Sequence, residues 1–160
     1  MTSGKPLIFT LLAASTLAIP ALAQSRTVTL NTQLKNYGGD GAYLAVYLVD
    51  AKGAYARTLW VAGGKAKYYK HLSDWNRLSA GDRKRLDGVT GASVGEGRTL
   101  KVTADLADAL LDAGYEIRID AAAEDMRDSA GEIRVPLTAA NAGKAHAGRQ
   151  YIQSFTYQLK

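Results

Sequence analysis

Residues that could do acid–base or metal chemistry are few and widely separated in this chain. The only histidines are His71 and His146, and two imidazoles so far apart in the sequence do not make a metal site. The acidic residues within 105–112 and 124–132 lack the alternating oxygen ligands of a calcium loop, so they predict charged turns. No zincin or Walker pattern occurs. The sequence therefore predicts no catalytic residue and no metal ligand, and we expect a protein other than a self-contained enzyme.

Aromatic and basic residues gather in one stretch that could bind a flat ring. The aromatic residues are Trp60, Tyr68, Tyr69 and Trp75. Aromatic side chains are common in sheets, so a core or sheet surface explains them. The alternative is a stacking platform for a planar ring, with nearby lysines for a phosphate. The residues alone leave both interpretations open.

Residues 87–93 read Asp-Gly-Val-Thr-Gly-Ala-Ser and follow the basic run 83–85. They are too rich in glycine and small polar residues for a strand, and we expect an exposed loop. The stretch fills every fixed position of Asp-x-x-Ser/Thr-Gly-Ala-Ser/Thr and so resembles the acceptor motif of extracytoplasmic flavinylated proteins. In those proteins a flavin transferase moves FMN from FAD onto the last hydroxyl of the motif, through a phosphoester bond.

This resemblance implies a cofactor and the residues that would hold it. Ser93 would carry covalent FMN, although this family usually ends the motif in Thr, and Thr90 is the alternative acceptor. Asp87 would serve recognition or positioning, while Gly91 and Ala92 would leave room for the nucleotide. The candidate flavin contacts are Trp60, Tyr68, Tyr69, Trp75 and Lys70, and the cations Lys65, Lys67 and 83–85 would balance the phosphate.

A second resemblance covers most of the chain. The segments 43–50, 57–63, 71–75 and 87–93 look like the predicted periplasmic family called domain of unknown function 2271 (DUF2271). Residues 114–119 match its late strand, whereas the Asp- and Ala-rich segment 104–111 departs from the usual Gly-rich loop. The resemblance implies an immunoglobulin-like antiparallel β-sandwich and a partnership with membrane-bound flavin or haem redox proteins.

The N-terminal residues have the three parts of a secretory signal peptide. Lys5 precedes an uncharged apolar run, 7–19, and Ala21-Leu22-Ala23 forms a small-x-small cleavage site. We expect residues 1–23 to be removed and residues 24–160 to form one periplasmic domain that does not span the membrane. The chain has no cysteine, which excludes disulfides and thiolate sites. Its net charge of +5 is spread out and forms no basic stripe, so we expect no nucleic-acid partner.

Short stretches of alternating or wholly apolar residues predict an all-β fold. The expected strands are 27–34, 43–49, 55–61, 100–105, 115–121, 133–137 and 151–159, with 43–49 and 55–61 paired as a hairpin. Residues 65–75 suggest a short strand running into a short helix, and Ser79 could begin a helical turn that ends at Leu86. Residues 105–114 fit either a helix or a strand–loop–strand connection.

Two functions of different classes remain. The first is a periplasmic electron-transfer carrier whose redox chemistry belongs to covalent FMN. The alternative is a cofactor-free immunoglobulin-like module that docks on a periplasmic or membrane redox complex.

Overall fold

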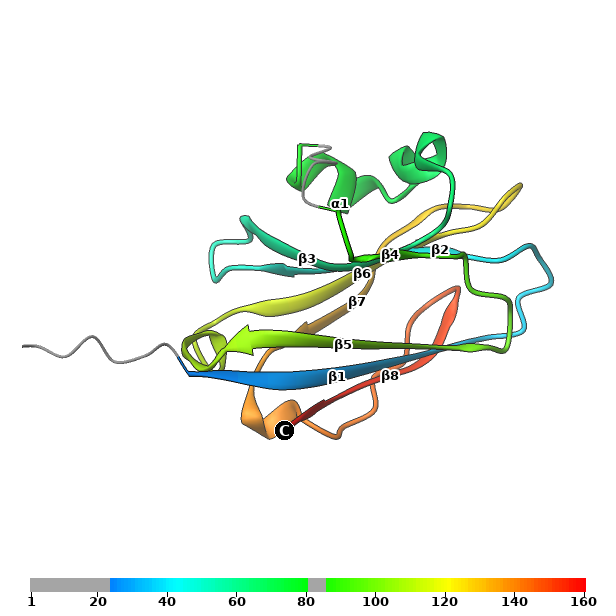
Figure 1. The fold of residues 1–160 in the computed structure, drawn as a ribbon. Helices are drawn as coiled ribbons and strands as arrows, with labels where there is room; N and C mark the ends of the chain where they lie inside the picture. Colours follow the sequence, from blue (N-terminus) through cyan, green and yellow to red (C-terminus); the bar gives the residue numbers. More distant parts are fainter. Residues whose placement is uncertain (1–23, 81–85) are drawn as a thin grey trace, which may run out of the picture.

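A computed structural model describes residues 24–80 and 86–160, which form two packed β-sheets with a helical layer on one of them (Figure 1). The expected signal peptide, 1–23, and the basic run 83–85 lie outside these residues. A three-stranded sheet has the order β5-β1-β8, with bounds Thr99–Ala107, Ser25–Leu34 and Ile152–Leu159. A five-stranded sheet has the order β4-β3-β2-β6-β7, with bounds Thr90–Gly91, Tyr55–Ala62, Tyr43–Val49, Glu116–Ala122 and Ser129–Pro136.

The predicted all-β sandwich is confirmed, and so is the hairpin of β2 and β3. Every strand pair is antiparallel except β3 with β4, which is parallel. The sandwich core lies between the two sheets and is filled by alternate strand residues, such as Leu30, Val46 and Phe155. The alternation in the sequence therefore marks this core correctly.

Strand β2 is apolar on both faces because both faces are covered. Its even-numbered residues, such as Leu44 and Leu48, pack into the sandwich core. Its odd-numbered residues, Tyr47 among them, pack into a second cluster beneath the helices. The sequence pattern predicted a strand covered on both sides, and the structure confirms it.

The helical layer consists of the 3₁₀-helix η1, Ala66–His71, and the helix α1, Ser73–Leu78. Figure 1 shows both lying over the outer face of the five-stranded sheet. The helical insertion before the 87–93 segment is thus confirmed, but the short strand predicted within 65–75 is wrong. Ser79 is the C-cap of α1, and the helical turn expected between it and Leu86 falls mostly outside the described residues.

The buried carboxylate of Asp120 on β6 fixes this layer to the sheet. One of its oxygens accepts the Trp75 N–H at 2.7 Å, and the other accepts the Gly131 N–H at 2.8 Å and the Tyr47 hydroxyl at 3.1 Å. Burial raises the pKa of Asp120, and these hydrogen bonds oppose that rise without cancelling it. The first turn of α1 is therefore held by a side chain from the middle of the sheet.

A second buried carboxylate, Glu132 on β7, joins the two sheets. Its Oε1 accepts the backbone N–H groups of Gln150, Tyr151 and Ile152 at 2.8, 2.8 and 3.0 Å, and its Oε2 accepts the Ser129 hydroxyl. Burial pushes the pKa of Glu132 upward, but these hydrogen bonds outweigh it and leave the pKa below its ordinary value.

Between β5 and β6 the chain forms a strand–loop–strand connection, so the helix considered for 105–114 is wrong. Strand β5 continues to Ala107, and only a single 3₁₀ turn, η3 at Asp108–Leu110, follows it. The side chain of Asp108 in this turn binds Arg26 of β1 at 2.7 Å. A further 3₁₀ turn, η4 at Ala139–Asn141, lies between β7 and β8.

Candidate functional site

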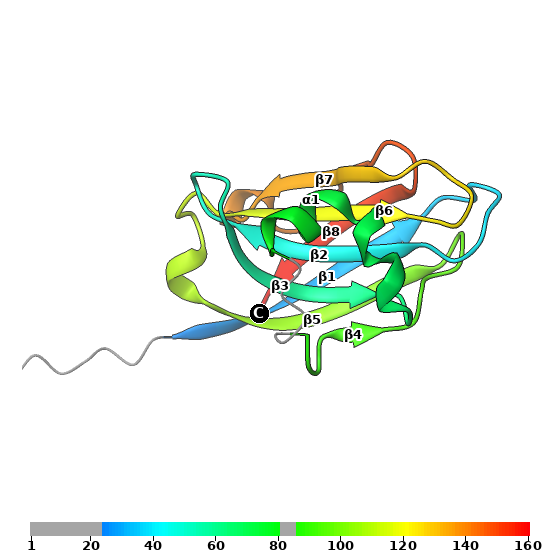
Figure 2. The ribbon, with the colours of Figure 1, turned by 90° about the horizontal axis from the view of Figure 1, so that it is seen from above.

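Residues 87–94 are fastened along the edge of the five-stranded sheet. The expectation of a strand-free loop is wrong at Thr90 and Gly91, which form β4 (Figure 2). The Val61 and Gly63 N–H groups donate to the carbonyls of Val89 and Gly91 at 2.8 and 2.7 Å. Backbone pairing with β3, which the local composition does not reveal, therefore holds this segment.

A second attachment lies directly beyond Ser93. Val94 and Ala42 form an isolated antiparallel bridge with both backbone hydrogen bonds, at 2.8 and 2.9 Å. Ser93 thus sits between two fixed points, β4 on one side and this bridge on the other. Its side chain is exposed, and backbone hydrogen bonds hold the chain on both sides of it.

The indole of Trp60 lies beneath Gly91. A Cβ atom at Gly91 would approach Trp60 Cζ2 to 2.7 Å, which is too close for two carbon atoms. The buried Trp60 Nε1 has no hydrogen-bond partner within residues 24–80 and 86–160. Contact with this ring therefore explains the absence of a side chain at Gly91, and the room that the motif resemblance implies for a nucleotide stays a prediction.

Gly41 lies against the Ser93 hydroxyl. A Cβ atom at Gly41 would come within 2.9 Å of Ser93 Oγ, so the absence of a side chain leaves room beside this oxygen. In the described part of the chain, Ser93 Oγ has no hydrogen-bond partner. The hydroxyl is thus exposed, unpaired and unobstructed.

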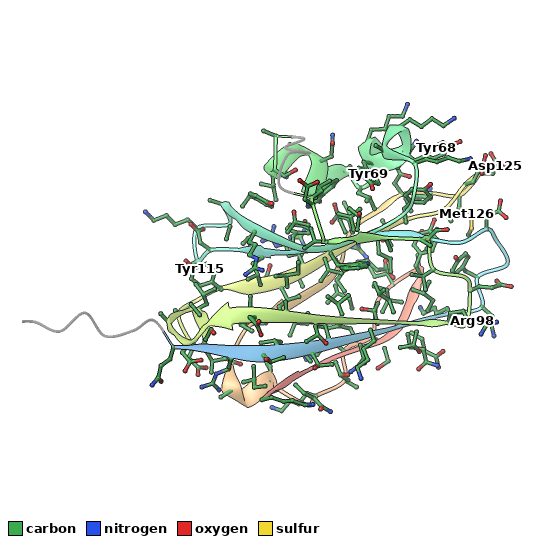
Figure 3. All side chains as sticks on the ribbon, in the orientation of Figure 1. Tyr68, Tyr69, Arg98, Tyr115, Asp125 and Met126 are labelled. Carbon is green, nitrogen blue, oxygen red and sulfur yellow. The ribbon has the colours of Figure 1, made fainter. Side chains whose placement is uncertain are left out.

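Ser93 lines a pocket of about 680 Å³ at one end of the sandwich. Its aromatic walls are Tyr43 at the start of β2 and Tyr68 from η1. Small or flexible apolar side chains also line it, namely Ala122, Ala123 and Met126. Figure 3 shows Tyr68 and Met126 at the same end of the molecule, whereas Tyr115 lies toward the other end. The volume lies in the range of roughly 300–1,000 Å³ that small-molecule sites occupy.

The two aromatic walls are held by other rings and by the backbone. The rings of Tyr43 and Tyr68 meet edge to face at 5.7 Å between centroids. Tyr43 also packs against Tyr69 at 6.4 Å, and the Tyr69 hydroxyl donates to the Gly63 carbonyl at 2.8 Å. Gly63 itself lies directly against the Tyr43 ring, because a Cβ there would come within 2.0 Å of Tyr43 Cδ1. Such packing restricts the orientation of the Tyr43 ring.

The rim of the pocket carries charges of both signs, with carboxylates in excess. The acidic side chains are Asp40, Glu124, Asp125 and Asp128, and the basic ones are Lys65 and His71. His71 Nδ1 lies 3.1 Å from Asp128 Oδ2, and both side chains are partly exposed. No group of three or more potential metal ligands occurs among the described residues.

The predicted flavin contacts are not all brought to this pocket. Tyr68 lines it, whereas Lys70 is exposed on η1 outside it. Tyr69 and Trp75 are buried in the cluster beneath the helices, and Trp75 Nε1 donates to Thr58 Oγ1 at 2.9 Å. Trp60 supports β4 and does not line the pocket. Of these aromatic side chains, Tyr68 therefore forms a wall of the pocket, and Tyr69 supports the wall that Tyr43 forms.

The residues of the motif also face different ways. Ser93 lines the large pocket, whereas Asp87 lines a separate hollow of about 310 Å³ together with Arg57 and Val89. Thr90 is exposed on β4, and neither hollow includes it. Of the two candidate acceptors, Ser93 is the one that lines the pocket of about 680 Å³.

Sequence reasoning missed most of the pocket lining, including Gly41, Tyr43 and Met126. Tyr43 is the first residue of an apolar strand, and such a residue necessarily lies at an end of the sandwich where loops gather. Met126 stands alone in an acidic turn, an unusual setting for an apolar side chain. Both signals were present in the sequence, but neither by itself points to a pocket.

None of the helices in the described residues is long and apolar enough to cross a membrane. Comparison with curated proteins and with solved structures gave no match. Residues 25–154, however, match the family described as "Predicted periplasmic protein (DUF2271)". This match covers nearly the whole sandwich, from β1 into β8, and it includes Ser93 and its pocket. The chain therefore belongs to the DUF2271 family of predicted periplasmic proteins.

Proposed function

We propose that this protein is a periplasmic electron-transfer carrier that holds FMN through a phosphoester on Ser93. One observation carries the proposal: the exposed Ser93 hydroxyl, at the end of the flavinylation motif, stands at the edge of an aromatic-walled pocket. A serine with no such pocket beside it would give an attached ring nothing to contact.

The attachment is a transfer that a flavin transferase performs on this chain. Ser93 Oγ attacks the FMN phosphorus of FAD, and the bond between that phosphorus and the bridging oxygen breaks. AMP leaves and takes up the serine proton, so the product is a phosphodiester between Ser93 and the ribityl chain. No electrons change hands in this step, and the flavin arrives oxidised.

The residues present fit this group. Gly41 leaves space beside Ser93 Oγ that any Cβ would reduce, and the pocket volume suits a planar heterocycle. FMN supplies the uptake and release of electrons. The chain's own contribution is to fix the acceptor oxygen in the backbone frame, to offer aromatic walls and to limit water around the ring.

Location and partners follow from the same proposal. Residues 1–23 would direct export, and the flavin transferase would meet the folded domain in the periplasm. A membrane-bound flavin or haem redox protein would then exchange electrons with it. A cofactor-free docking module is the alternative function, and it needs neither the hydroxyl nor the pocket.

Co-expression with a flavin transferase, followed by intact-mass measurement of the exported protein, tests the proposal. The expected product is heavier by one FMN less one water, and its band fluoresces in a denaturing gel. Ser93→Ala removes this mass, whereas Thr90→Val and the exposed-serine control Ser73→Ala retain it. Unmodified wild type in the presence of active transferase and FAD would favour the docking module. FMN retained in Ser93→Ala but lost in Thr90→Val would move the acceptor to Thr90.

A further inference from the structure

We infer that the pocket beside Ser93 is a docking site for the isoalloxazine ring, so that the attached flavin lies against Tyr68 and does not swing free in solvent. This inference rests on the proposed function, because it concerns the ring of the FMN that Ser93 would carry. It goes further in naming the surface that receives the ring and the residue that controls its environment.

The first support is the chemistry of the pocket walls. Tyr43 and Tyr68 present aromatic surface, Ala122 and Ala123 form a smooth side, and the Met126 thioether is suited to contact with a ring. A flat aromatic ligand gains from each of these surfaces.

The second support is the arrangement of charge. The rim holds four carboxylates, Asp40, Glu124, Asp125 and Asp128, against Lys65 and His71. The proposed ester fixes the phosphate at Ser93, and the carboxylates, which would repel a free phosphate, do not repel a neutral ring. The ring carries an N–H donor and two carbonyl acceptors, for which carboxylates and basic side chains are the matching partners.

The third support is the tether. A ring joined to Ser93 is confined near the pocket at an effective concentration in the millimolar range, so that an intrinsic affinity of about 1 mM already gives substantial docking. The walls also need little reordering, because Tyr43 is fixed by Gly63 and Tyr69. Docking therefore costs little conformational entropy on the protein side.

Tyr68 is the residue through which docking is measured. It is partly exposed on η1, makes an edge-to-face contact with Tyr43 and lies under the ammonium group of Lys67 at 4.8 Å. A tyrosine in contact with an excited flavin transfers an electron to it and quenches its fluorescence. A docked ring is therefore dim and gives visible circular dichroism, whereas a free ring is bright and gives almost none.

The experiment compares FMN-loaded wild type with Tyr68→Ala and the control Tyr115→Ala, which removes a partly buried tyrosine away from the pocket. Intact mass reports attachment, and fluorescence lifetime, iodide quenching and visible circular dichroism report docking. We expect a several-fold shorter mean lifetime in wild type and in the control than in free FMN. Tyr68→Ala should recover most of the free lifetime with unchanged mass. Met126→Ala is the second variant if Tyr68→Ala unfolds, and it should lengthen the lifetime in the same direction.

Two outcomes separate this inference from the proposed function. If wild type carries FMN by mass but has the lifetime and dichroism of free FMN, docking is wrong and attachment stands. A titration of Ser93→Ala protein into micromolar riboflavin tests the pocket without any attachment. The docking site is supported if riboflavin fluorescence is quenched with a dissociation constant near the millimolar range and this quenching is weaker in the double variant Ser93→Ala/Tyr68→Ala. No quenching at all overturns it.

Discussion

Replacing Gly91 by alanine should displace the motif from its place on the sheet. The added Cβ would lie 2.7 Å from Trp60 Cζ2, about 1 Å inside the ordinary carbon–carbon contact of roughly 3.5–4.0 Å. The indole is packed against the sandwich core, so β4 is the more mobile partner. A shift of that size would also stretch the 2.7 Å hydrogen bond from Gly63 N–H to the Gly91 carbonyl beyond bonding distance.

The expected cost is about 1–3 kcal/mol in the free energy of unfolding, which is the usual range for overpacking. For a domain of this size that corresponds to a fall in Tm of roughly 4–12 °C. Urea unfolding measures the free energy, and a time course of intact mass with purified transferase measures FMN attachment, which should slow because Ser93 moves with β4. Gly64→Ala is the matched control, because a Cβ at this neighbouring glycine meets no atom within 4 Å.

A double-mutant cycle with Trp60→Leu identifies the contact. Leucine lacks the ring atoms that the new Cβ would strike, so Gly91→Ala should cost less than about 0.5 kcal/mol in that background. An equal cost in both backgrounds would refute the steric explanation, and so would a cost in Gly64→Ala as large as that in Gly91→Ala.

Three further changes test the site and its support. Gly41→Ala brings a Cβ within 2.9 Å of Ser93 Oγ, so FMN attachment should slow by about tenfold or more, while Tm stays near that of Gly64→Ala. Equal attachment rates in the two variants would show that the space beside Ser93 Oγ does not matter. In Asp120→Asn, an NH₂ group replaces one of two oxygens that both accept hydrogen bonds, so at least one buried donor loses its acceptor in either amide orientation. The free energy of unfolding measured in urea should therefore fall by about 1–3 kcal/mol. Glu132→Gln weakens three backbone hydrogen bonds and should cost about 1–3 kcal/mol at neutral pH. Because the pKa of Glu132 is lowered in the folded state, its contribution is present above the ordinary value of 4.5 and lost as the pH falls through the folded pKa. The deficit of Glu132→Gln should therefore shrink in urea titrations below that pH, and a deficit that persists at low pH would contradict this assignment.

The strands were predictable because each has a short-range pattern that burial imposes. The alternation of β1 and β5 and the doubly apolar β2 follow from which faces are covered, and the structure agrees with them. Strand β4 was not predictable, since its two residues pair with β3 only after the chain has crossed the helical layer. Its conformation depends on a partner about thirty positions away and not on its own composition.

The motif resemblance points to Ser93, which stays a predicted acceptor, but the pocket beside it was not predictable from the sequence. Nothing local decides which of the adjacent residues Tyr68 and Tyr69 faces outward. A 3₁₀-helix turns neighbouring side chains about 120° apart, and docking of η1 on the sheet buries Tyr69 and leaves Tyr68 at the pocket. Trp75 is buried for the same reason, because Asp120 fixes the first turn of α1.

The pairing of β4 with β3 has a consequence for how another protein can handle this domain. Unpaired backbone N–H and C=O groups at the edge of a sheet can pair with strands of other chains and so promote aggregation. The segment 87–94 covers this edge of β3, and β4 is too short to pair with a strand of another chain. An enzyme that drew the whole segment into its own cleft would break the hydrogen bonds at Val61, Gly63 and Ala42 and uncover β3. A transferase that approached the hydroxyl in place would leave this edge covered, so the segment proposed to carry the flavin also protects the sheet from pairing with other chains.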